Sequence, residues 1–192
     1  MRAAVMGTGS WGTAFAATLA DAGTPVVMWG RRQDSVDQIN AGCNADYLPD
    51  LQLPEGMSAT TDPIKALEDA DIVVLAVPSQ TLRTNLGAWA DHLPADAAVV
   101  SLMKGVELGT TKRMSEVIEE VGRVAPSRIV VLSGPNLARE IANKQPAASV
   151  VACRDHATAD RVAAACATGY FRPYTNTDVV GTELGGAVKN VV

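Results

Sequence analysis

The sequence contains few aromatic residues and few residues that bind metals or form disulfides. Only 4% of its 192 residues are aromatic, and it has three cysteines and two histidines. Cys43, Cys153 and Cys166 lie far apart, with no Cys-x-x-Cys pair and no histidine at metal-ligand spacing. We therefore expect no metal site and no disulfide framework. Cys153 and Cys166 are interpreted as small core residues, and a reducing, cytoplasmic location fits best.

Excess positive charge and long apolar runs are also absent. The formal net charge is -5, so no global basic field attracts nucleic acid. Arg2 precedes an apolar stretch that glycines interrupt at positions 7, 9 and 12, which argues against a signal peptide. No apolar run reaches transmembrane length. These features predict a soluble protein without nucleic-acid partners or membrane insertion, and 47% hydrophobic residues suffice for a sizeable α/β core.

A glycine-rich stretch near the N-terminus, residues 5–12, reads Val-Met-Gly-Thr-Gly-Ser-Trp-Gly. It joins a predicted apolar strand to a helix that begins near Ser10. In such a turn Gly7 permits the tight exit from the strand, Gly9 lets the backbone approach a pyrophosphate, and Gly12 lets the helix lie close to the sheet. The pattern therefore predicts a dinucleotide site. A structural turn without a ligand is the alternative.

The second predicted strand, Pro25–Trp29, ends in Gly30-Arg31-Arg32. In a dinucleotide-binding fold this position contacts the cofactor ribose, where an acidic residue selects NAD and an arginine accommodates the 2′-phosphate of NADP. No acidic residue occurs before Asp34. The sequence thus favours NADP(H), with NAD(H) as the other candidate and Arg31 and Arg32 as cofactor ligands. Two solvated surface arginines are the alternative interpretation.

Strands and helices alternate along the rest of the chain. A helix is expected over Gln33–Ala41, followed by a loop over Gly42–Gly56 in which Tyr47 either covers the cofactor or anchors the loop. Further strands are predicted at Asp71–Val77, Ala97–Leu102, Ile129–Leu132, Pro146–Ala152 and Tyr170–Tyr174. Further helices are predicted at Pro63–Asp69 with Asp62 as its cap, Gln80–Ala90, Thr111–Val121, Leu137–Asn143, Asp155–Ala167 and Thr177–Val192. This order indicates an α/β fold of the Rossmann type, doubly wound, with a mostly parallel sheet and flanking helices.

Two lysines are candidate catalytic groups. Lys104 follows a predicted central strand and so faces the ligand crevice. Lys189 lies in the last predicted helix, where its stem passes over Gly185 and Gly186 and leaves room for a small substrate, with Asn190 beside it. Interior glycines cost a helix about 1 kcal/mol each relative to alanine, which calls for an explanation. Close helix packing beside a surface lysine is the other explanation.

Four motifs occur together in the order of a known family. They are residues 7–14 (GTGSWGTA), 101–107 (SLMKGVE), 133–140 (SGPNLARE) and 185–190 (GGAVKN). The sequence thereby resembles, over its full length, the bacterial NAD(P)-dependent glycerol-3-phosphate dehydrogenases. It departs from that family at Asn136 and Leu137, where a small hydroxyl residue and phenylalanine are common.

The resemblance implies reduction of dihydroxyacetone phosphate to sn-glycerol 3-phosphate with NAD(P)H, feeding glycerophospholipid synthesis. Lys189 would donate and accept the proton, Lys104 would contact both cofactor and substrate, and Lys104 is expected to tune the protonation of Lys189. The implied cofactor residues are Gly7, Gly9, Ser10, Trp11, Gly12, Arg31, Arg32, Lys104 and Ala138. The implied substrate residues are Lys104, Gly134, Asn136 and Lys189.

The resemblance also implies a division of the chain. Residues 1–176 would form the dinucleotide-binding domain, and residues 177–192 would begin an all-helical substrate domain that is otherwise absent. We therefore expect the chain to bind NADP(H) with weak or no turnover and to expose an association-prone apolar face. Two other functions stay open, a related hydroxyacid or hydroxyacyl dehydrogenase and a noncatalytic nucleotide-binding sensor. A homodimer is also left open.

Overall fold

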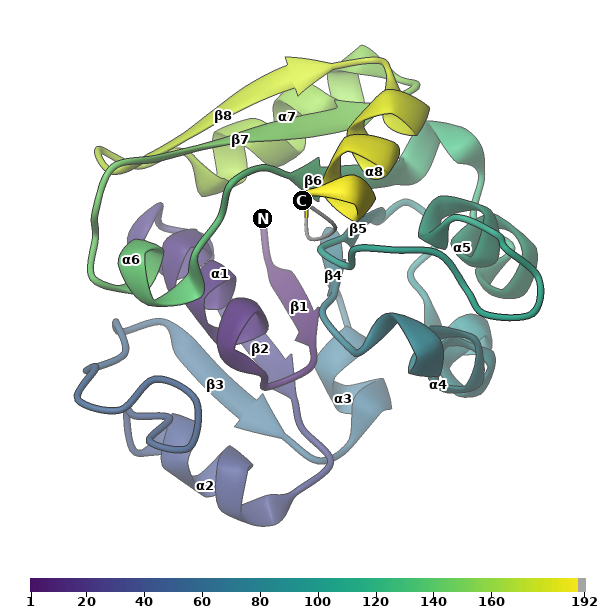
Figure 1. Ribbon diagram of the computed structural model, residues 1–192. Coiled ribbons are helices and arrows are strands. Elements are labelled where there is room, and N and C mark those ends of the chain that lie inside the picture. The colour runs from purple at the N-terminus through teal and green to yellow at the C-terminus, as the bar shows by residue number, and fades with distance from the viewer. Residues whose placement is uncertain (190–192) are drawn as a thin grey trace.

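One mixed sheet organises the molecule. The computed structural model describes residues 1–189, and its eight strands lie in the order β3-β2-β1-β4-β5-β6-β7-β8 (Figure 1). The first six strands in this order run parallel, whereas β7 runs antiparallel to β6 and parallel to β8. The strands are β1 (Ala3–Met6), β2 (Val26–Trp29), β3 (Met57–Thr60), β4 (Ile72–Leu75), β5 (Ala98–Ser101), β6 (Ile129–Ser133), β7 (Ala147–Cys153) and β8 (Phe171–Asn176).

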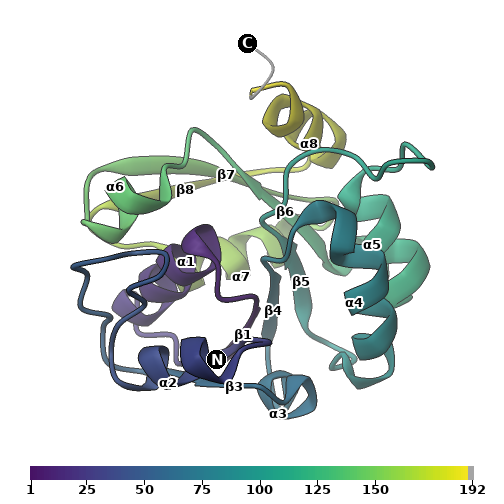
Figure 2. The same ribbon diagram turned by 60° about the horizontal axis from the view of Figure 1, so that its bottom comes forward.

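Helices cover both faces of the sheet. They are α1 (Ser10–Asp21), α2 (Gln33–Asn40), α3 (Pro63–Leu67), α4 (Leu82–Trp89), α5 (Met114–Gly122), α6 (Ala138–Ala142), α7 (His156–Cys166) and α8 (Val179–Val188). Short 3-10 turns occupy Ser79–Thr81, Ala90–His92 and Pro126–Arg128. Figure 2 shows α1 and α7 on one side of the sheet and α3, α4 and α5 on the other. The predicted doubly wound, mostly parallel α/β fold is therefore confirmed.

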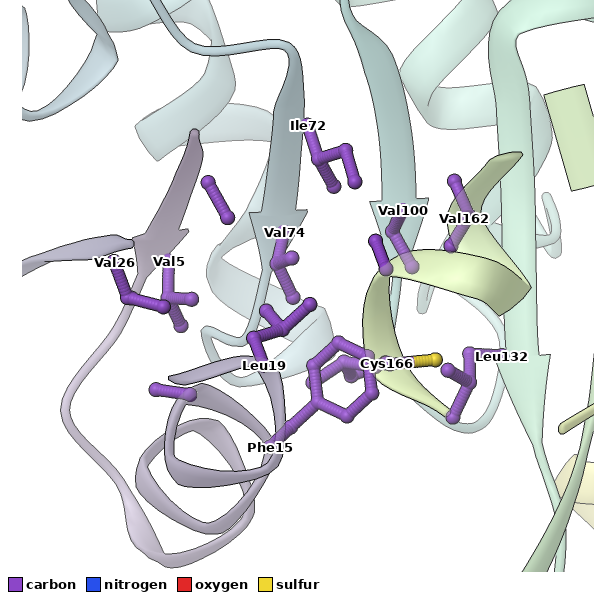
Figure 3. Packing of buried hydrophobic residues seen from close by; sticks show 14 of the residues in the cluster. Val5, Phe15, Leu19, Val26, Ile72, Val74, Val100, Leu132, Val162 and Cys166 are labelled. Atoms are coloured by element: carbon purple, nitrogen blue, oxygen red, sulfur yellow. The ribbon is translucent and has the colours of Figure 1, made fainter. Parts of the chain in front are cut away.

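The first face of the sheet packs against α1 and α7. Phe15 and Leu19 of α1 point at the valines of the central strands, and Cys166 of α7 reaches the same layer (Figure 3). Phe15 also meets Phe171 of β8 edge to face, with ring centroids 6.1 Å apart. Cys166 is fully buried and is therefore a core residue, as predicted. This burial raises the pKa of its thiol to about 12.

The second face packs against α3, α4 and α5. Because strand side chains alternate, Ala4, Val73 and Val99 point to this face while their neighbours point to the first. Trp29 at the end of β2 meets Trp89 of α4 with ring centroids 4.8 Å apart. With both faces buried, the central strands are almost entirely apolar, which is why their positions could be predicted.

Several boundaries differ from the predictions. The edge strand β3 was not predicted, and it pairs with β2 although no apolar run marks it. The helix predicted from Thr111 begins at Met114, because Thr111 adopts a left-handed conformation with φ of +57°. Asp62 caps α3 as expected, accepting hydrogen bonds from the backbone N–H groups of Ile64 and Lys65. Residues 190–192 lie outside the described part of the chain, so the predicted role of Asn190 and the end of the last helix are not described.

The reversed strand β7 determines where the last helix points. β7 and β8 run opposite to the six parallel strands, so β8 ends away from the carboxyl edge of the sheet. Helix α8 then returns alongside β6. Its first residue, Val179, packs with Val131 in the middle of β6, and Gly186 lies against Ser133 at the carboxyl end of that strand. Lys189 is thereby delivered to the edge of the sheet where ligands bind in such folds.

Candidate functional site

The glycine turn between β1 and α1 forms the floor of a cleft. Gly7 has φ of +133°, and a Cβ there would lie 2.5 Å from the carbonyl oxygen of Ala76. A Cβ at Gly12 would lie 2.9 Å from the Ala76 side chain, so α1 approaches the end of β4 closely only because residue 12 is glycine. Gly9, by contrast, faces open space, with no atom within 4 Å of a Cβ added there.

Helix α1 offers an uncapped N-terminus at this turn. Gly9 is its N-cap residue and supplies no side chain that could accept a hydrogen bond. The first N–H groups of the helix have no partners within the helix, and the helix dipole places partial positive charge there. Open space in front of an uncapped helix of 12 residues fits a pyrophosphate.

The cleft extends from this turn along the carboxyl ends of the parallel strands. It has a volume of about 400 Å³. Its wall comprises residues 7–12, Trp29 to Arg31 after β2, residues 76–78 after β4, and Leu102 and Met103 after β5. It therefore crosses the boundary between β1 and β4, where the strand order reverses and where dinucleotides bind in doubly wound sheets.

A loop between α2 and β3 supports the turn and overhangs the cleft. Asn44 is buried, and its Nδ2 donates to the carbonyl of Thr8 at 3.0 Å and to Oγ1 of Thr13 at 2.8 Å. Sequence reasoning did not single out this residue. Tyr47, from the same loop, lines the cleft with a side chain that is nearly half exposed. The two roles considered for Tyr47, covering a cofactor and anchoring the loop, both stay predictions.

The two arginines after β2 have different surroundings. Arg31 lines the cleft and is exposed. Arg32 lies outside the cleft wall, and its guanidinium forms an ion pair with Asp46. Of these two arginines, Arg31 is the one that lines the cleft, whereas Arg32 already has a carboxylate partner.

A second, more apolar hollow lies beside α8. Its wall combines the turn after β6 with one side of that helix, namely Ser133, Gly134, Pro135, Val150, Gly181, Thr182, Gly185, Gly186 and Lys189. A Cβ at Gly186 would lie 2.5 Å from Oγ of Ser133, so a larger residue there would force the Ser133 side chain to move. Gly185 faces open space, which leaves the room beside Lys189 that the sequence predicted.

Lys104 connects the cleft and this hollow. Leu102 and Met103, which precede it, line the dinucleotide cleft. Its own Nζ donates to the carbonyl of Gly134 at 3.2 Å, in the wall of the second hollow. Burial first, and then the positive charge of Lys189, lower the pKa of Lys104 below its ordinary value. The hypothesis that Lys104 in turn tunes the protonation of Lys189 stays a prediction.

The remaining predicted site residues lie near these two spaces. Ala138, in the first turn of α6, packs against the same small apolar cluster as Trp11 and borders a groove that Ser10 also lines. Asn136 follows Gly134, and its Oδ1 accepts a hydrogen bond from Oγ of Ser149 at 2.7 Å, while its buried Nδ2 has no partner. Asn136 itself lies outside the wall of the second hollow, although Gly134 and Pro135 before it are part of that wall.

Glu107, in the motif that follows Lys104, has a structural position that the sequence did not reveal. Both of its carboxylate oxygens accept hydrogen bonds from Arg83 of α4, at 2.8 and 3.0 Å, and Thr110 Oγ1 donates to it as well. Arg83 also donates to Glu120 of α5 at 3.0 Å. The loop after Lys104 is therefore held to α4 and α5.

Among residues 1–189, no cluster of histidine, cysteine or acidic side chains is arranged to hold a metal ion. In the same part of the chain, no helix combines the length and apolar character needed to cross a membrane. The candidate ligand-binding groups named above include the backbone N–H groups of the turn, Arg31, the Asn136 amide and the two lysines.

The sheet order, the uncapped glycine turn and the cleft at the strand reversal define a dinucleotide-binding domain of the Rossmann class. The chain belongs to the family described as NAD-dependent glycerol-3-phosphate dehydrogenase N-terminus, whose model matches residues 2–159.

Relatives and solved structures agree with this assignment. The glycerol-3-phosphate dehydrogenase [NAD(P)+] of Streptomyces griseus is 62% identical over 193 residues, which cover 100% of this chain and 57% of that protein. The crystal structure of glycerol-3-phosphate dehydrogenase from Coxiella burnetii superposes with a TM-score of 0.91 at 32% identity, covering 99% of this chain and 58% of that one. The yeast enzyme gives a TM-score of 0.88 at 28% identity. The chain thus spans little more than half the length of the relatives it matches.

Proposed function

We propose that this chain is the cofactor-binding part of an NAD(P)-dependent glycerol-3-phosphate dehydrogenase that reduces dihydroxyacetone phosphate to sn-glycerol 3-phosphate. One observation carries the proposal. Residues 102–104 join the two spaces, because Met103 lines the dinucleotide cleft while Nζ of Lys104 reaches Gly134 in the second hollow. A cofactor and a small substrate bound in these spaces would meet at Lys104.

In this proposal the turn and the end of β2 hold the cofactor. The free N–H groups at Ser10 and Trp11 bind the pyrophosphate, and Tyr47 covers the cleft. Arg31 is the ligand for a ribose 2′-phosphate, which supports a preference for NADP(H) over NAD(H). Arg32 contributes less, since Asp46 already neutralises it.

The second hollow is the proposed substrate site. A nicotinamide cofactor, when bound, would supply the hydride. Lys189 donates a proton to the oxygen of the reduced carbonyl and accepts it in the reverse reaction. Lys104, Gly134 and Asn136 orient the substrate, and the unpartnered Nδ2 of Asn136 supplies one donor. The division into a cofactor domain, 1–176, and the start of a substrate domain, 177–192, belongs to the same proposal, as does a cytoplasmic location.

The test of this proposal uses the complete protein that the gene encodes. Fluorescence titration with NADPH and NADH measures cofactor binding, and the loss of reduced-nicotinamide absorbance on adding dihydroxyacetone phosphate measures turnover. Lys189→Met should lower kcat by roughly 10²- to 10⁴-fold, the usual contribution of a general acid, without weakening NADPH binding. Lys112→Met is the matched control, because Lys112 pairs with Glu120 on α5 and contacts neither space.

Two outcomes would replace the proposal. Turnover with a hydroxyacid or hydroxyacyl thioester but none with dihydroxyacetone phosphate would assign the chain to a related dehydrogenase. Binding of nucleotide with no turnover on any of these substrates would indicate a noncatalytic sensor. A sample that contains residues 1–192 alone is expected to bind NADPH and to reduce dihydroxyacetone phosphate slowly or not at all.

A further inference from the structure

Helix α8 is attached to the start of α5 by one buried carboxylate. Glu183 lies in the middle of α8, and its side chain is 8% exposed. It accepts a hydrogen bond from the Arg113 guanidinium at 2.7 Å and another from the backbone N–H of Ser115 at 2.8 Å. Oγ of Ser115 donates to it as well. Almost seventy residues of chain separate these partners, so the contact joins two distant elements.

The contact compensates for a weak cap on α5. The N-cap residue of that helix is Arg113, whose side chain has donors only and accepts no hydrogen bond from the free N–H groups of the first turn. Glu183 supplies the missing acceptor from another helix, and its charge lies at the positive end of the α5 dipole. A buried carboxylate with three donors is fully satisfied, and breaking the arrangement would leave a charge without partners.

The same anchor is joined to the Lys104 loop. Arg113 forms an isolated antiparallel bridge with Val106, two residues after Lys104. Along α8, Glu183 is followed one turn later by Gly186, which contacts Ser133, and after another turn by Lys189. Fixing the rotation of α8 at Glu183 therefore fixes both the glycine contact and the direction from which Lys189 enters the site.

We propose that Glu183 is a positioning residue that sets the distance between Lys189 on α8 and Lys104 on the β5–α5 loop, acting through Arg113 and Ser115. The inference rests on the proposed function, since it concerns how the proton-transferring lysine is held. Glu183 lines neither the dinucleotide cleft nor the second hollow, and its effect is transmitted by the orientation of α8.

Glu183→Gln tests the proposal because it keeps the size of the side chain and removes the charge. The matched control is Glu116→Gln, which removes the other carboxylate beside Arg113 without any contact with α8. The first readout is the titration of Lys104, followed by NMR in protein with labelled lysine. Loss of the anchor should move the Lys104 midpoint back toward the ordinary lysine value, as the charge of Lys189 moves away. Glu116→Gln should leave the Lys104 midpoint unchanged.

Two further readouts complete the test. Backbone amides of residues 184–188 should exchange hydrogen about tenfold faster or more in Glu183→Gln, while those of α1 stay as in the wild type. With dihydroxyacetone phosphate, kcat should fall on the order of tenfold at an unchanged Kd for NADPH, because a misplaced general acid affects turnover and not cofactor binding. Ser115→Ala removes one donor only and should give smaller changes of the same sign, which keeps the test available if Glu183→Gln folds poorly.

The outcomes separate this inference from the proposed function. If the wild type shows no turnover, the proposed function fails, while the titration and exchange readouts still report on the anchor. If the wild type is active and Glu183→Gln has the wild-type Lys104 midpoint, exchange and kcat, Glu183 does not position the lysine and the inference is overturned. An equal loss in the Glu116→Gln control would also overturn it, because the effect would then be one of charge near Arg113 alone.

Discussion

At the scale of single residues, the two arginines after β2 should differ in their effect on cofactor choice. Arg31 lines the cleft, whereas Arg32 is paired with Asp46. A charge-assisted hydrogen bond contributes about 1.5–3 kcal/mol, so Arg31→Ala should weaken NADPH binding roughly ten- to a hundredfold. NADH lacks the 2′-phosphate, and its affinity should stay nearly constant. Fluorescence titration with NADPH and with NADH measures the two affinities. Arg32→Ala is the control and should change them less. Equal losses for the two nucleotides would contradict the assignment of Arg31.

We expect Lys104 to lower the free energy of unfolding at neutral pH. Burial and the charge of Lys189 lower its pKa below the ordinary value of 10.5. The unfolded chain therefore binds this proton more tightly, and the free energy of unfolding rises as pH increases through the window between the two values. Lys104→Met should raise the thermal midpoint at pH 7, and the gain should shrink as pH approaches 10.5. Differential scanning calorimetry over this range tests the sign, with Lys112→Met as the control. A lower midpoint at pH 7 would show that the bond to Gly134 outweighs the charge penalty.

Residue-scale prediction from sequence succeeded where local spacing determines geometry. The open space at Gly9 and Gly185 and the close contact at Gly12 follow from their positions beside a strand end and a lysine, whereas Gly186, which was predicted to leave room beside Lys189, contacts Ser133 instead. The pairing of Arg32 with Asp46 could not be foreseen, because loop conformation decides which of two adjacent arginines meets a carboxylate. Glu183 was placed on the correct helix, but its partners come from a distant segment that no local pattern indicates.

At the scale of elements, Arg83 should stabilise the loop after Lys104 in a pH-dependent way. Its guanidinium holds the pKa of Glu107 below the usual range, and together with Lys112 it lowers the pKa of Glu120 to about 2. Carboxylates with lowered pKa values stabilise the fold above the unfolded value of about 4.5, and this contribution is lost as pH falls toward about 2. Arg83→Met should therefore lower the thermal midpoint at pH 7, with the difference from wild type decreasing below pH 4.5.

The control for that experiment is Arg123→Met, since Arg123 pairs with Asp91 at a highly exposed position where an ion pair contributes little. Circular dichroism melts between pH 2 and pH 7 supply the comparison. A constant difference between Arg83→Met and wild type across that range would mean that packing, not charge, accounts for the loss.

Elements were predictable in proportion to how completely they are buried. The central strands read as apolar runs, and every one of them was located. The edge strand β3, Met57 to Thr60, has no fully buried residue, and its pairing with β2 depends on backbone groups that carry no sequence signal. The antiparallel direction of β7 was likewise unpredictable, since a strand of given composition can pair with β6 in either direction.

At the scale of the whole molecule, α8 presents an apolar stripe to solvent. Val180, Leu184 and Val188 recur at four-residue spacing on one side of the helix and are 42%, 47% and 56% exposed. We expect the chain to self-associate as its concentration rises, because contiguous apolar surface favours contact. Leu184→Gln combined with Val188→Gln should reduce association in sedimentation velocity experiments. Ile64→Gln, at an isolated exposed position on α3, should not. Identical sedimentation of all three proteins would exclude the stripe as the cause.

The layout of the dinucleotide cleft also bears on how the protein is made. Every residue in its wall occurs by position 103, whereas Lys189 is among the last residues described. Chains emerge from the ribosome N-terminus first, so all cleft residues are available before the lysine helix is synthesised. The layer under α1 closes later, since Phe171 of β8 and α7 complete it. Under the proposed function, nucleotide present during synthesis would therefore meet the cleft residues before Lys189, the proposed proton donor, has been added to the chain.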